Sequence, residues 1–552
     1  MCGTSDGTSS SGYGYNKAGQ MIVQTRVIKG TNYQTNWAFD NYGRLISENF
    51  ANDSYKVSYG YDTLSRINTV KVRIQGADKD VVKSITYEPY GGIKSWTYGN
   101  DLTRTTSFDK DYRITGINTE AIQKLSHSYN INNLISNVDN SLEVNRSATY
   151  TYDAIGQLTK STSTQYIESW TFDKNSNRST RVGNTNLTTN YQTNIGNRLA
   201  STTITEAKSF TYDVLGNLIK KTGHGGTVDY SYDGFNRLKT VKAGSNSTNY
   251  DYDVFNLRTR KTGGAGNVNY IYSPDGRLLG ESNTSDTNIS TAYVWLYGQV
   301  IGVVRNNTLN FVHNDHLGRP EVLTNLSKTV VWKSQNNSYD SNVIQSSIGQ
   351  FNIGLPGQYY DVESGLWYNW NRYFDGTVGR YTQPDPIGLA GGVNTYTYVG
   401  NNPVNFIDPY GLWSLSIEGY YGVGGGASIS YNNGTLEVTG KLGVGLGAGV
   451  GLDPNGKPSK HALDCGSGAI ARTSSKLEMG AGIGPIEATL FGVSGYTGNG
   501  LVQSEKGGDF QFTKPELVIP GVTVDPSKKF SWRIGGSVGG NVSAEFGHYS
   551  NW

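Results

Sequence analysis

The chain has 552 residues, of which 47 are Lys or Arg and 45 are Asp or Glu, so its formal net charge is only +2. Because these charges are spread without a basic block, the whole-chain electrostatics of a nucleic-acid binder are missing. The two cysteines, Cys2 and Cys465, are too few for a disulfide framework and stand at no metal-ligand spacing, so we expect neither a metal nor a cofactor. We also expect no signal peptide and no transmembrane helix.

Tyrosine and glycine dominate the composition. There are 39 Tyr against 16 Phe and 10 Trp, together with 71 Gly. Aromatic and β-branched side chains suit a pleated surface, whereas Gly, Asn and Asp supply turns. Few segments show the apolar rhythm of an amphipathic helix. The sequence therefore predicts an all-β protein.

One phrase recurs from the beginning of the chain. It consists of an aromatic residue, a small or polar residue, Tyr or Phe, Asp, a few variable residues that often include Gly or Asn, and then Arg or Asn with an aliphatic residue. From Phe172 to Tyr272 the steps are 19, 21, 20, 20 and 20 residues. Such a period predicts a solenoid-like array with one hairpin per unit. We expect each Asp to accept hydrogen bonds from the backbone amides of its turn. The clearest copies are centred on Phe39, Tyr61, Tyr152, Phe172, Tyr212, Tyr232 and Tyr252.

Two stretches follow the repeats, "FVHNDHLGRPEVLTN" at residues 311–325 and a run from Gly354 to Leu412. The first contains ligand-type residues, His313, Asp315 and His316, but no further ligand stands at a recognisable spacing. We interpret it as a structural turn rather than a metal site.

The repeated Tyr-Asp phrase resembles the YD repeats of the RHS (rearrangement hot spot) family over about residues 13 to 412. The run from Gly354 to Leu412 is similar, almost phrase by phrase, to that family's RHS-repeat-associated core. The resemblance implies a spiral β-sheet wound into a hollow shell, a β-cocoon closed by the core. It also implies that the shell encloses a variable C-terminal domain, often a toxin, which is released by self-cleavage after the last Asp-Pro-x-Gly-Leu.

Two aspartates within this run have the same surroundings. Asp385 lies in "QPDPIGL" and Asp408 in "FIDPYGL", so two equivalent turns could present them to one another. Two close carboxylates do not both ionise easily, so one can keep a proton while the other acts as a base on water. Arg372, in "NRYFD", could hold one of them ionised. The alternative is that both aspartates only form turns and that Arg372 is a structural partner.

The resemblance implies roles for these residues. The matching Arg and Asp positions of self-cleaving RHS cores are the protease residues, which assigns an aspartyl-type autoprotease to Arg372, Asp385 and Asp408. The scissile bond would join Leu412 to Trp413, and the bulky Trp413 would have to fit the site.

Residues 413–552 lack the YD phrase and are rich in glycine, with period-two alternation that predicts β-hairpins. One interpretation is a membrane-active module whose strands close on themselves in a bilayer. The other is a small enzymatic toxin. We favour the membrane-active module. The candidate residues of the enzymatic alternative are His461, Asp464, Cys465 and His548.

These observations predict three domains: a YD-repeat array at 1–290, truncated at its start, an RHS core with the autoprotease motif at 291–412, and a cargo domain at 413–552. The predicted function is a secreted or injected polymorphic-toxin effector of interbacterial competition. Its expected partners are its own C-terminal domain, a cognate immunity protein, a secretion apparatus and a target membrane, without nucleic-acid contact by the shell. A structural or adhesive cell-surface YD-repeat protein without cleavage is the alternative.

Overall fold

The computed structural model describes residues 3–5, 9–50, 55–89, 91–203, 207–264, 266–285 and 287–412, and within the Gly-rich segment the strands β38 to β44. Its architecture is all-β, as predicted. Strands β1 to β33 form one antiparallel sheet in which each strand pairs with the next in the chain. Among the described strands β1 pairs only with β2 and β33 only with β32, so the sheet is an open spiral and not a closed barrel.

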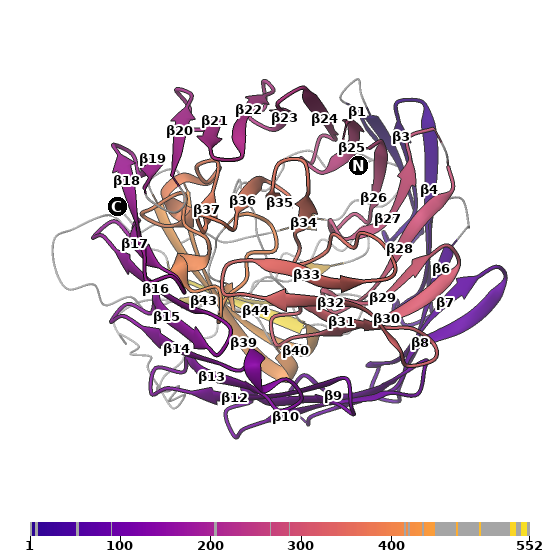
Figure 1. Cartoon of the computed structure of the whole chain (residues 1–552). Helices are drawn as coiled ribbons and strands as arrows, with labels where there is room; N and C mark the ends of the chain where they lie inside the picture. The colour runs from indigo at the N-terminus through magenta and orange to yellow at the C-terminus, as the bar shows by residue number, and fades with distance from the viewer. Residues whose placement is uncertain are drawn as a thin grey trace.

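The first part of this sheet forms the curved outer wall (Figure 1). Its strands are β1 (Gly3–Ser5), β2 (Ser9–Tyr15), β3 (Met21–Ile28), β4 (Thr31–Phe39), β5 (Leu45–Phe50), β6 (Tyr55–Tyr61), β7 (Ile67–Ile74), β8 (Ala77–Tyr87), β9 (Ile93–Tyr98), β10 (Thr103–Phe108), β11 (Ile114–Thr119), β12 (Gln123–Tyr129), β13 (Ile135–Asn140), β14 (Ala148–Tyr152), β15 (Leu158–Ser163), β16 (Ile167–Phe172), β17 (Arg178–Val182), β18 (Thr188–Asn194), β19 (Arg198–Thr202), β20 (Lys208–Tyr212), β21 (Leu218–Gly223), β22 (Gly226–Tyr232), β23 (Leu238–Ala243), β24 (Asn246–Tyr252) and β25 (Arg258–Gly263).

The remaining strands of the sheet turn inward and cover the inner face of the first ones. The two layers approach each other closely at Val81 of β8 and Gly302 of β29, because a Cβ atom on Gly302 would lie 2.8 Å from Cγ1 of Val81. Apolar residues from both layers share one buried core. These inner strands are β26 (Val268–Tyr272), β27 (Leu278–Asn283), β28 (Ile289–Leu296), β29 (Gln299–Arg305), β30 (Thr308–Asn314), β31 (Pro320–Thr324), β32 (Val330–Asn336) and β33 (Ser341–Ser346).

The YD phrase forms the turn of each hairpin, as predicted. In one copy Oδ1 of Asp62 accepts hydrogen bonds from the backbone amides of Leu64 at 2.8 Å and Arg66 at 2.9 Å, while Nε of Arg66 donates to Oδ2 at 2.7 Å. The residue three after the Asp is left-handed, with φ of 63° at Ser65. This backbone conformation explains why Gly or Asn recurs there. The hydroxyl of Tyr61 donates to the carbonyl of Leu45 at 2.7 Å and so ties one unit to the previous one.

A small second sheet lies inside the curved wall (Figure 1). It consists of β34 (Tyr359–Asp361), β35 (Leu366–Asn369), β36 (Arg372–Asp375) and β37 (Arg380–Tyr381). Two 3-10 turns follow, η3 (Gly388–Gly391) and η4 (Val399–Asn401), and a third, η1 (Val144–Arg146), belongs to the wall. We call residues 354–412 the core segment.

Polar side chains of the core segment are bonded to successive YD turns of the wall. Asn402 Nδ2 donates to the carbonyl of Gly156 at 2.8 Å, and the hydroxyl of Tyr396 donates to the carbonyl of Gly216 at 2.7 Å. Gln383 Nε2 donates to a third turn at 2.9 Å from the carbonyl of Asn236. The regular spacing of the turns thus fixes the core segment in place.

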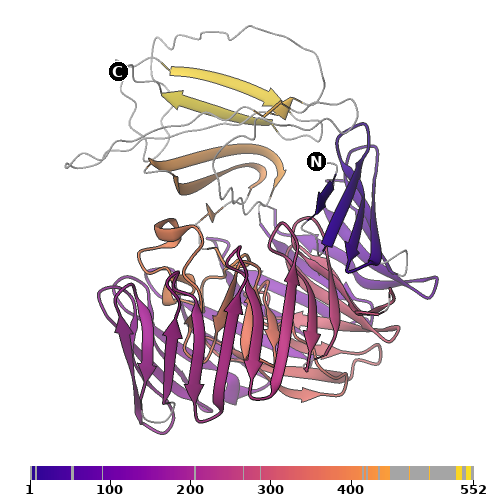
Figure 2. The ribbon, with the colours of Figure 1, turned by 90° about the horizontal axis from the view of Figure 1, so that it is seen from above.

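The Gly-rich segment contributes the sheet β38–β39–β40–β44–β43 and the short pair β41 and β42. Strands β39 and β40 form the expected hairpin, paired from Tyr420 and Gly447 to Asn432 and Thr435. Figure 2 draws β39, β40, β43 and β44 beyond one end of the curved sheet. The strands are β38 (Ser416–Ile417), β39 (Tyr420–Asn432), β40 (Thr435–Gly447), β41 (Ala471–Arg472), β42 (Tyr496–Thr497), β43 (Phe530–Gly536) and β44 (Val542–His548).

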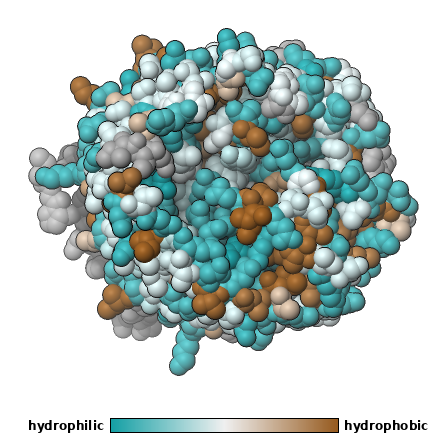
Figure 3. All heavy atoms as spheres, in the orientation of Figure 1, coloured by the Kyte–Doolittle hydropathy of each residue, from teal (hydrophilic) through white to brown (hydrophobic). Residues whose placement is uncertain are grey.

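The surface in the view of Figure 1 is mostly hydrophilic or neutral, with apolar side chains in separate spots and a larger group toward the lower right (Figure 3). Within the residues that the structure describes, no helix is long and apolar enough to cross a bilayer. The predicted domain limits stay a prediction. Strand β28 continues the sheet across residue 290.

Candidate active site

The three predicted polar residues meet inside the core segment. Nη2 of Arg372 lies 2.9 Å from Oδ2 of Asp385 and 3.3 Å from Oδ2 of Asp408. Both carboxylates therefore contact the same guanidinium nitrogen, and their oxygens cannot be farther apart than the sum of these two distances. All three side chains are only 1% exposed. Buried charges persist where they are paired, and a buried cation shared by two carboxylates is a candidate functional site.

The two Asp-Pro-x-Gly-Leu phrases do not form the equivalent turns that the sequence suggested. They share a left-handed glycine, with φ of 62° at Gly388 and 64° at Gly411. However, Oδ1 of Asp385 accepts the amide of Ile387 at 3.0 Å, two residues on, and the chain continues into η3. Oδ1 of Asp408 instead accepts the amide of Leu412 at 3.0 Å, four residues on. The second turn is therefore wider and holds the segment that leads to the predicted cleavage point.

Arg372 is fixed by contacts on every side of its guanidinium group. Nε donates to the carbonyl of Gly411 at 2.5 Å and Nη1 to the carbonyl of Thr395 at 3.0 Å. The ring centroid of Tyr381 lies 3.6 Å from Cζ, within the range of a cation–π contact. Because the planar guanidinium donates in several fixed directions, Lys could not make this set of contacts.

Sequence reasoning missed two residues of this site, Tyr381 and Asn369. The hydroxyl of Tyr381 donates to Oδ2 of Asp408 at 2.6 Å. Nδ2 of Asn369 lies 2.8 Å from that hydroxyl and 2.7 Å from the backbone carbonyl of Asp408. Burial, and then the negative charge of Asp408, raise the pKa of Tyr381 well above its usual value. The only signal in the sequence was that Tyr381 stands two residues before the start of "QPDP".

Of the two residues joined by the predicted scissile bond, only Leu412 lies within the described residues. Leu412 is 9% exposed, and its amide is held by Asp408 as stated above. The backbone before it is closely packed, since a Cβ atom on Gly411 would lie 2.3 Å from the carbonyl oxygen of Asn369. Trp413 lies outside the described residues.

The histidine-rich stretch forms a structural turn, as interpreted from the sequence. Oδ2 of Asp315 accepts Nε of Arg319 at 2.7 Å in a YD-type turn. Nε2 of His313 lies 2.9 Å from Oγ1 of Thr324, and burial lowers the pKa of His313 to about 3. Nε2 of His316 is engaged by a backbone carbonyl at 2.9 Å. The described part of the chain holds no group of three or more potential metal-binding side chains.

The candidates of the enzymatic alternative in the Gly-rich segment are not brought together by the described structure. His461, Asp464 and Cys465 lie outside the described residues, and His548 is the last residue of β44.

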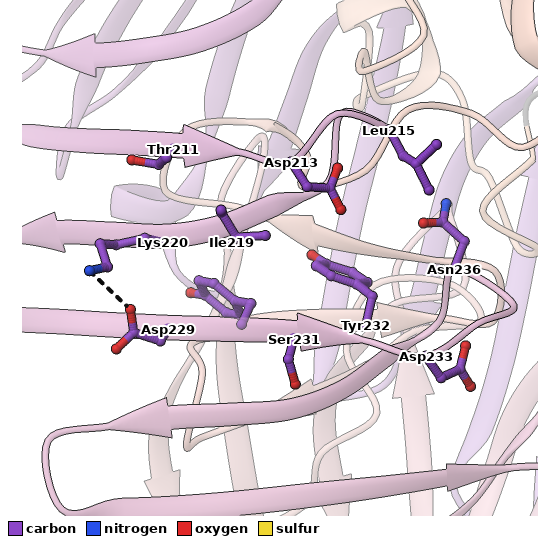
Figure 4. A pocket seen from close by; sticks show the side chains of 11 residues that line it. Thr211, Asp213, Leu215, Ile219, Lys220, Asp229, Ser231, Tyr232, Asp233 and Asn236 are labelled. Atoms are coloured by element: carbon purple, nitrogen blue, oxygen red, sulfur yellow. Dashed lines mark ion pairs between the residues drawn. The ribbon is translucent and has the colours of Figure 1, made fainter.

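A wide hollow of about 700 Å³ lies on the wall, and neither Asp385 nor Asp408 lines it (Figure 4). Its acidic groups belong to the scaffold. Asp213 accepts the amide of Asn217 at 2.8 Å within its own turn, and Asp229 is paired at 3.5 Å with Lys220. The hollow therefore shows no convergent catalytic arrangement.

The repeated turns, the curved sheet and the inner core segment define a YD-repeat shell protein. Comparison with known families agrees, because the family described as Teneurin YD-shell matches residues 117–404, which is more than half of the chain. The chain belongs to this family. The resemblance to RHS and YD-repeat proteins is thereby confirmed.

Several relatives of this chain are named as toxins. Toxin protein Tse5 of Pseudomonas aeruginosa is 37% identical over 117 residues, 21% of this chain and 9% of that protein. Double-stranded DNA deaminase toxin A of Burkholderia cenocepacia is 33% identical over 129 residues, 22% of this chain and 9% of that protein. The matched part thus covers less than a tenth of either relative.

Solved structures share the fold. The Tc holotoxin pore of Photorhabdus luminescens superposes with a TM-score of 0.63 at 19% identity. The match covers 74% of this chain and 23% of that chain, and at this identity it supports the fold alone.

Proposed function

We propose that the chain is a toxin-type YD-shell effector that cuts its own backbone between Leu412 and Trp413 and thereby frees residues 413–552 as cargo. The observation that carries the proposal is the buried contact of Asp385 and Asp408 with one nitrogen of Arg372. The hydrogen bond from Leu412 to Asp408 adds to it, because it ties the pair to the predicted cleavage point.

The chemistry is hydrolysis of a peptide bond by a carboxylate pair. One carboxylate takes a proton from a water molecule, whose oxygen bonds to the carbonyl carbon of Leu412. The other carboxylic acid gives its proton to the nitrogen of Trp413 as the carbon–nitrogen bond breaks. The products are a new carboxyl group at Leu412 and a new amino group at Trp413, so atoms and protons balance.

Replacing either aspartate with asparagine tests the proposal. Asp385→Asn and Asp408→Asn keep the side-chain shape but remove the acid–base function, so we expect the fragment of residues 413–552 seen with the wild type to be lost on denaturing gels. Asp233→Asn, which makes the same change in a wall turn, is the control and should still cleave. A folded wild-type protein that stays whole would favour the structural or adhesive alternative.

For the cargo, the relative named a DNA deaminase toxin favours a small enzymatic toxin over the membrane-active module. Expression of residues 413–552 in bacteria separates the two. We expect growth arrest with damaged or altered nucleic acid and an intact membrane potential. Rapid loss of membrane potential would instead support the membrane-active module.

We also infer that the shell encloses or shields the cargo until cleavage, and that a cognate immunity protein and a secretion apparatus are partners. The position of the small sheet β34–β37 inside the curved wall supports this inference (Figure 1). The described strands β39, β40, β43 and β44 are drawn beyond one end of the wall (Figure 2), which favours shielding at that end over full enclosure. An effector of this kind is secreted or injected.

A further inference from the structure

We propose that Asn394 and Tyr396 are positioning residues of the proposed protease, which fasten the short segment they bracket to two turns of the wall. That segment in turn holds Arg372 and Asp385. The inference rests on the proposed function, and it names the part of the shell on which cleavage depends. Three observations carry it: a backbone carbonyl shared by Arg372 and Asp385, the bonds of the two side chains beside this carbonyl, and the wall positions that accept those bonds.

The shared carbonyl belongs to Thr395. It accepts Nη1 of Arg372 at 3.0 Å and the backbone amide of Asp385 at 2.9 Å. A carbonyl oxygen has two lone pairs, so it can satisfy both donors at once. The carbonyl of the next residue, Tyr396, accepts the amide of Tyr381 at 2.9 Å. This short segment is therefore bonded to three residues of the site, and a displacement of Thr395 would disturb Arg372 and Asp385 together.

Asn394 bonds one end of the segment to the wall turn that begins at Asp173. Its Nδ2 donates to the carbonyl of Asn175 at 2.9 Å and to Oδ1 of Asn177 at 2.7 Å. Its Oδ1 accepts the amide of Tyr396 at 3.1 Å. A backbone carbonyl can only accept and a backbone amide can only donate, so these bonds fix the orientation of the side-chain amide. Asn394 is buried, so breaking them would leave its polar atoms unsatisfied.

Tyr396 bonds the other end of the segment to the wall turn that begins at Asp213. Its hydroxyl donates to the carbonyl of Gly216 at 2.7 Å, and its ring lies edge-on to Tyr212 with 6.1 Å between the centroids. Gly216 is left-handed, with φ of 90°, and a Cβ atom there would lie 2.5 Å from the hydroxyl oxygen of Tyr396. Glycine thus serves both the turn and the approach of Tyr396.

The wall can offer these acceptors because the backbone bonds of its turns use other carbonyls. In the turn at Asp213, the amide of Gly216 donates to Asp213 at 3.1 Å and the amide of Asp213 donates to Asn217 at 2.9 Å. The carbonyl of Gly216 is left to the core segment. The same position of the next wall turn, Asn236, accepts Gln383. The core segment is therefore held at several points, so losing one bond should shift the site without detaching the segment.

Cleavage then depends on a folded wall. The turns at Asp173 and Asp213 must form before Asn394 and Tyr396 can bond to them. Both turns also precede the core segment in the chain, so the wall can be in place when the core segment folds against it. The geometry thus couples the cut to assembly of the wall, and a chain whose wall is unfinished would keep its cargo attached.

Tyr396→Phe tests the inference because it removes only the hydroxyl. The full chain is made by cell-free translation, and conversion of the labelled chain to its fragment is followed on denaturing gels. Melting temperatures are measured in the non-cleaving Asp408→Asn background, so that rates are compared where every variant is folded. We expect about tenfold slower cleavage, since a small displacement of a catalytic group costs up to about a hundredfold in rate. Asn394→Ala should slow cleavage as well, and the double variant most.

Two further variants make the result specific. Tyr98→Phe is the matched control: it also loses one buried hydroxyl that donates to a backbone carbonyl, but this bond joins the wall to the inner strands at Val312, so the cleavage rate should stay unchanged. Gly216→Ala alters the wall side of the Tyr396 contact. It should slow cleavage more in the wild type than beside Tyr396→Phe, because the hydroxyl oxygen that its methyl group would meet is then gone.

A wild-type cleavage rate in folded Tyr396→Phe or Asn394→Ala protein would overturn the inference and leave the proposed autoprotease standing. So would an equal effect of Gly216→Ala in both backgrounds, or a Tyr98→Phe protein that slows as much as Tyr396→Phe, because the loss would then follow from general destabilisation. A wild type that folds but never cleaves would overturn both proposals, which distinguishes the two failures.

Discussion

At the scale of single residues, the site depends on a glycine as much as on its charged groups. Oδ2 of Asp385 lies so close to Gly391 that a Cβ atom there would be 2.2 Å from it. The polar residues were predictable, since Arg372, Asp385 and Asp408 stand in recognisable phrases. Tyr381 was not, because its role depends on the pairing of β36 with β37 and on a bond across 27 residues of chain.

Gly391→Ala should therefore slow self-cleavage without unfolding the protein. The added methyl group forces Asp385 away from Arg372, and a misplaced catalytic group costs roughly tenfold to a hundredfold in rate. Gly234→Ala is the matched control, because nothing lies within 4 Å of its Cβ position. The measurement is the cleavage rate together with the melting temperature. Unchanged cleavage in a folded Gly391→Ala protein would show that Asp385 need not contact Arg372.

At the scale of elements, each repeat unit is a hairpin, and the Asp side chain accepts hydrogen bonds from the backbone amides of its turn. The repeat period predicted one hairpin per unit, and β22 paired with β23 through the turn at Asp233 is such a unit. Strands β28 to β33 were harder to predict, since only the stretch around Asp315 there resembles the phrase. Strands β28 to β31 are almost continuously buried, and a repeat period does not reveal such burial.

Asp233→Ala should loosen one wall turn locally. The carboxylate accepts the amides of Phe235 at 2.9 Å and Arg237 at 3.0 Å, so its loss costs about 1–3 kcal/mol. Asp229→Ala, in the strand that leads into this turn, is the control: its pair with Lys220 is half exposed and contributes little. Hydrogen exchange of the two amides is the measurement. We expect faster exchange with Asp233→Ala alone, and equal exchange in both variants would contradict this role of the carboxylate.

At the scale of the whole molecule, the spiral is held by contacts between distant parts of the chain. The hydroxyl of Tyr98 donates to the carbonyl of Val312 at 2.9 Å across the two layers. Nη2 of Arg258 in the wall donates to Oδ1 of Asp361 in the core segment at 3.0 Å, and both side chains are fully buried. The family resemblance implied such a shell, but no local pattern marks these partners. Together these contacts keep the paired aspartates in a buried and rigid setting.

We propose that this buried setting cuts the chain once, after Leu412. The most direct test is to let the wild-type protein fold, isolate the smaller fragment and determine its N-terminal sequence. We expect the sequence to begin at Trp413 and the fragment to be absent from Asp408→Asn. A folded chain that stays whole, or a fragment that begins at another residue, would contradict the claim.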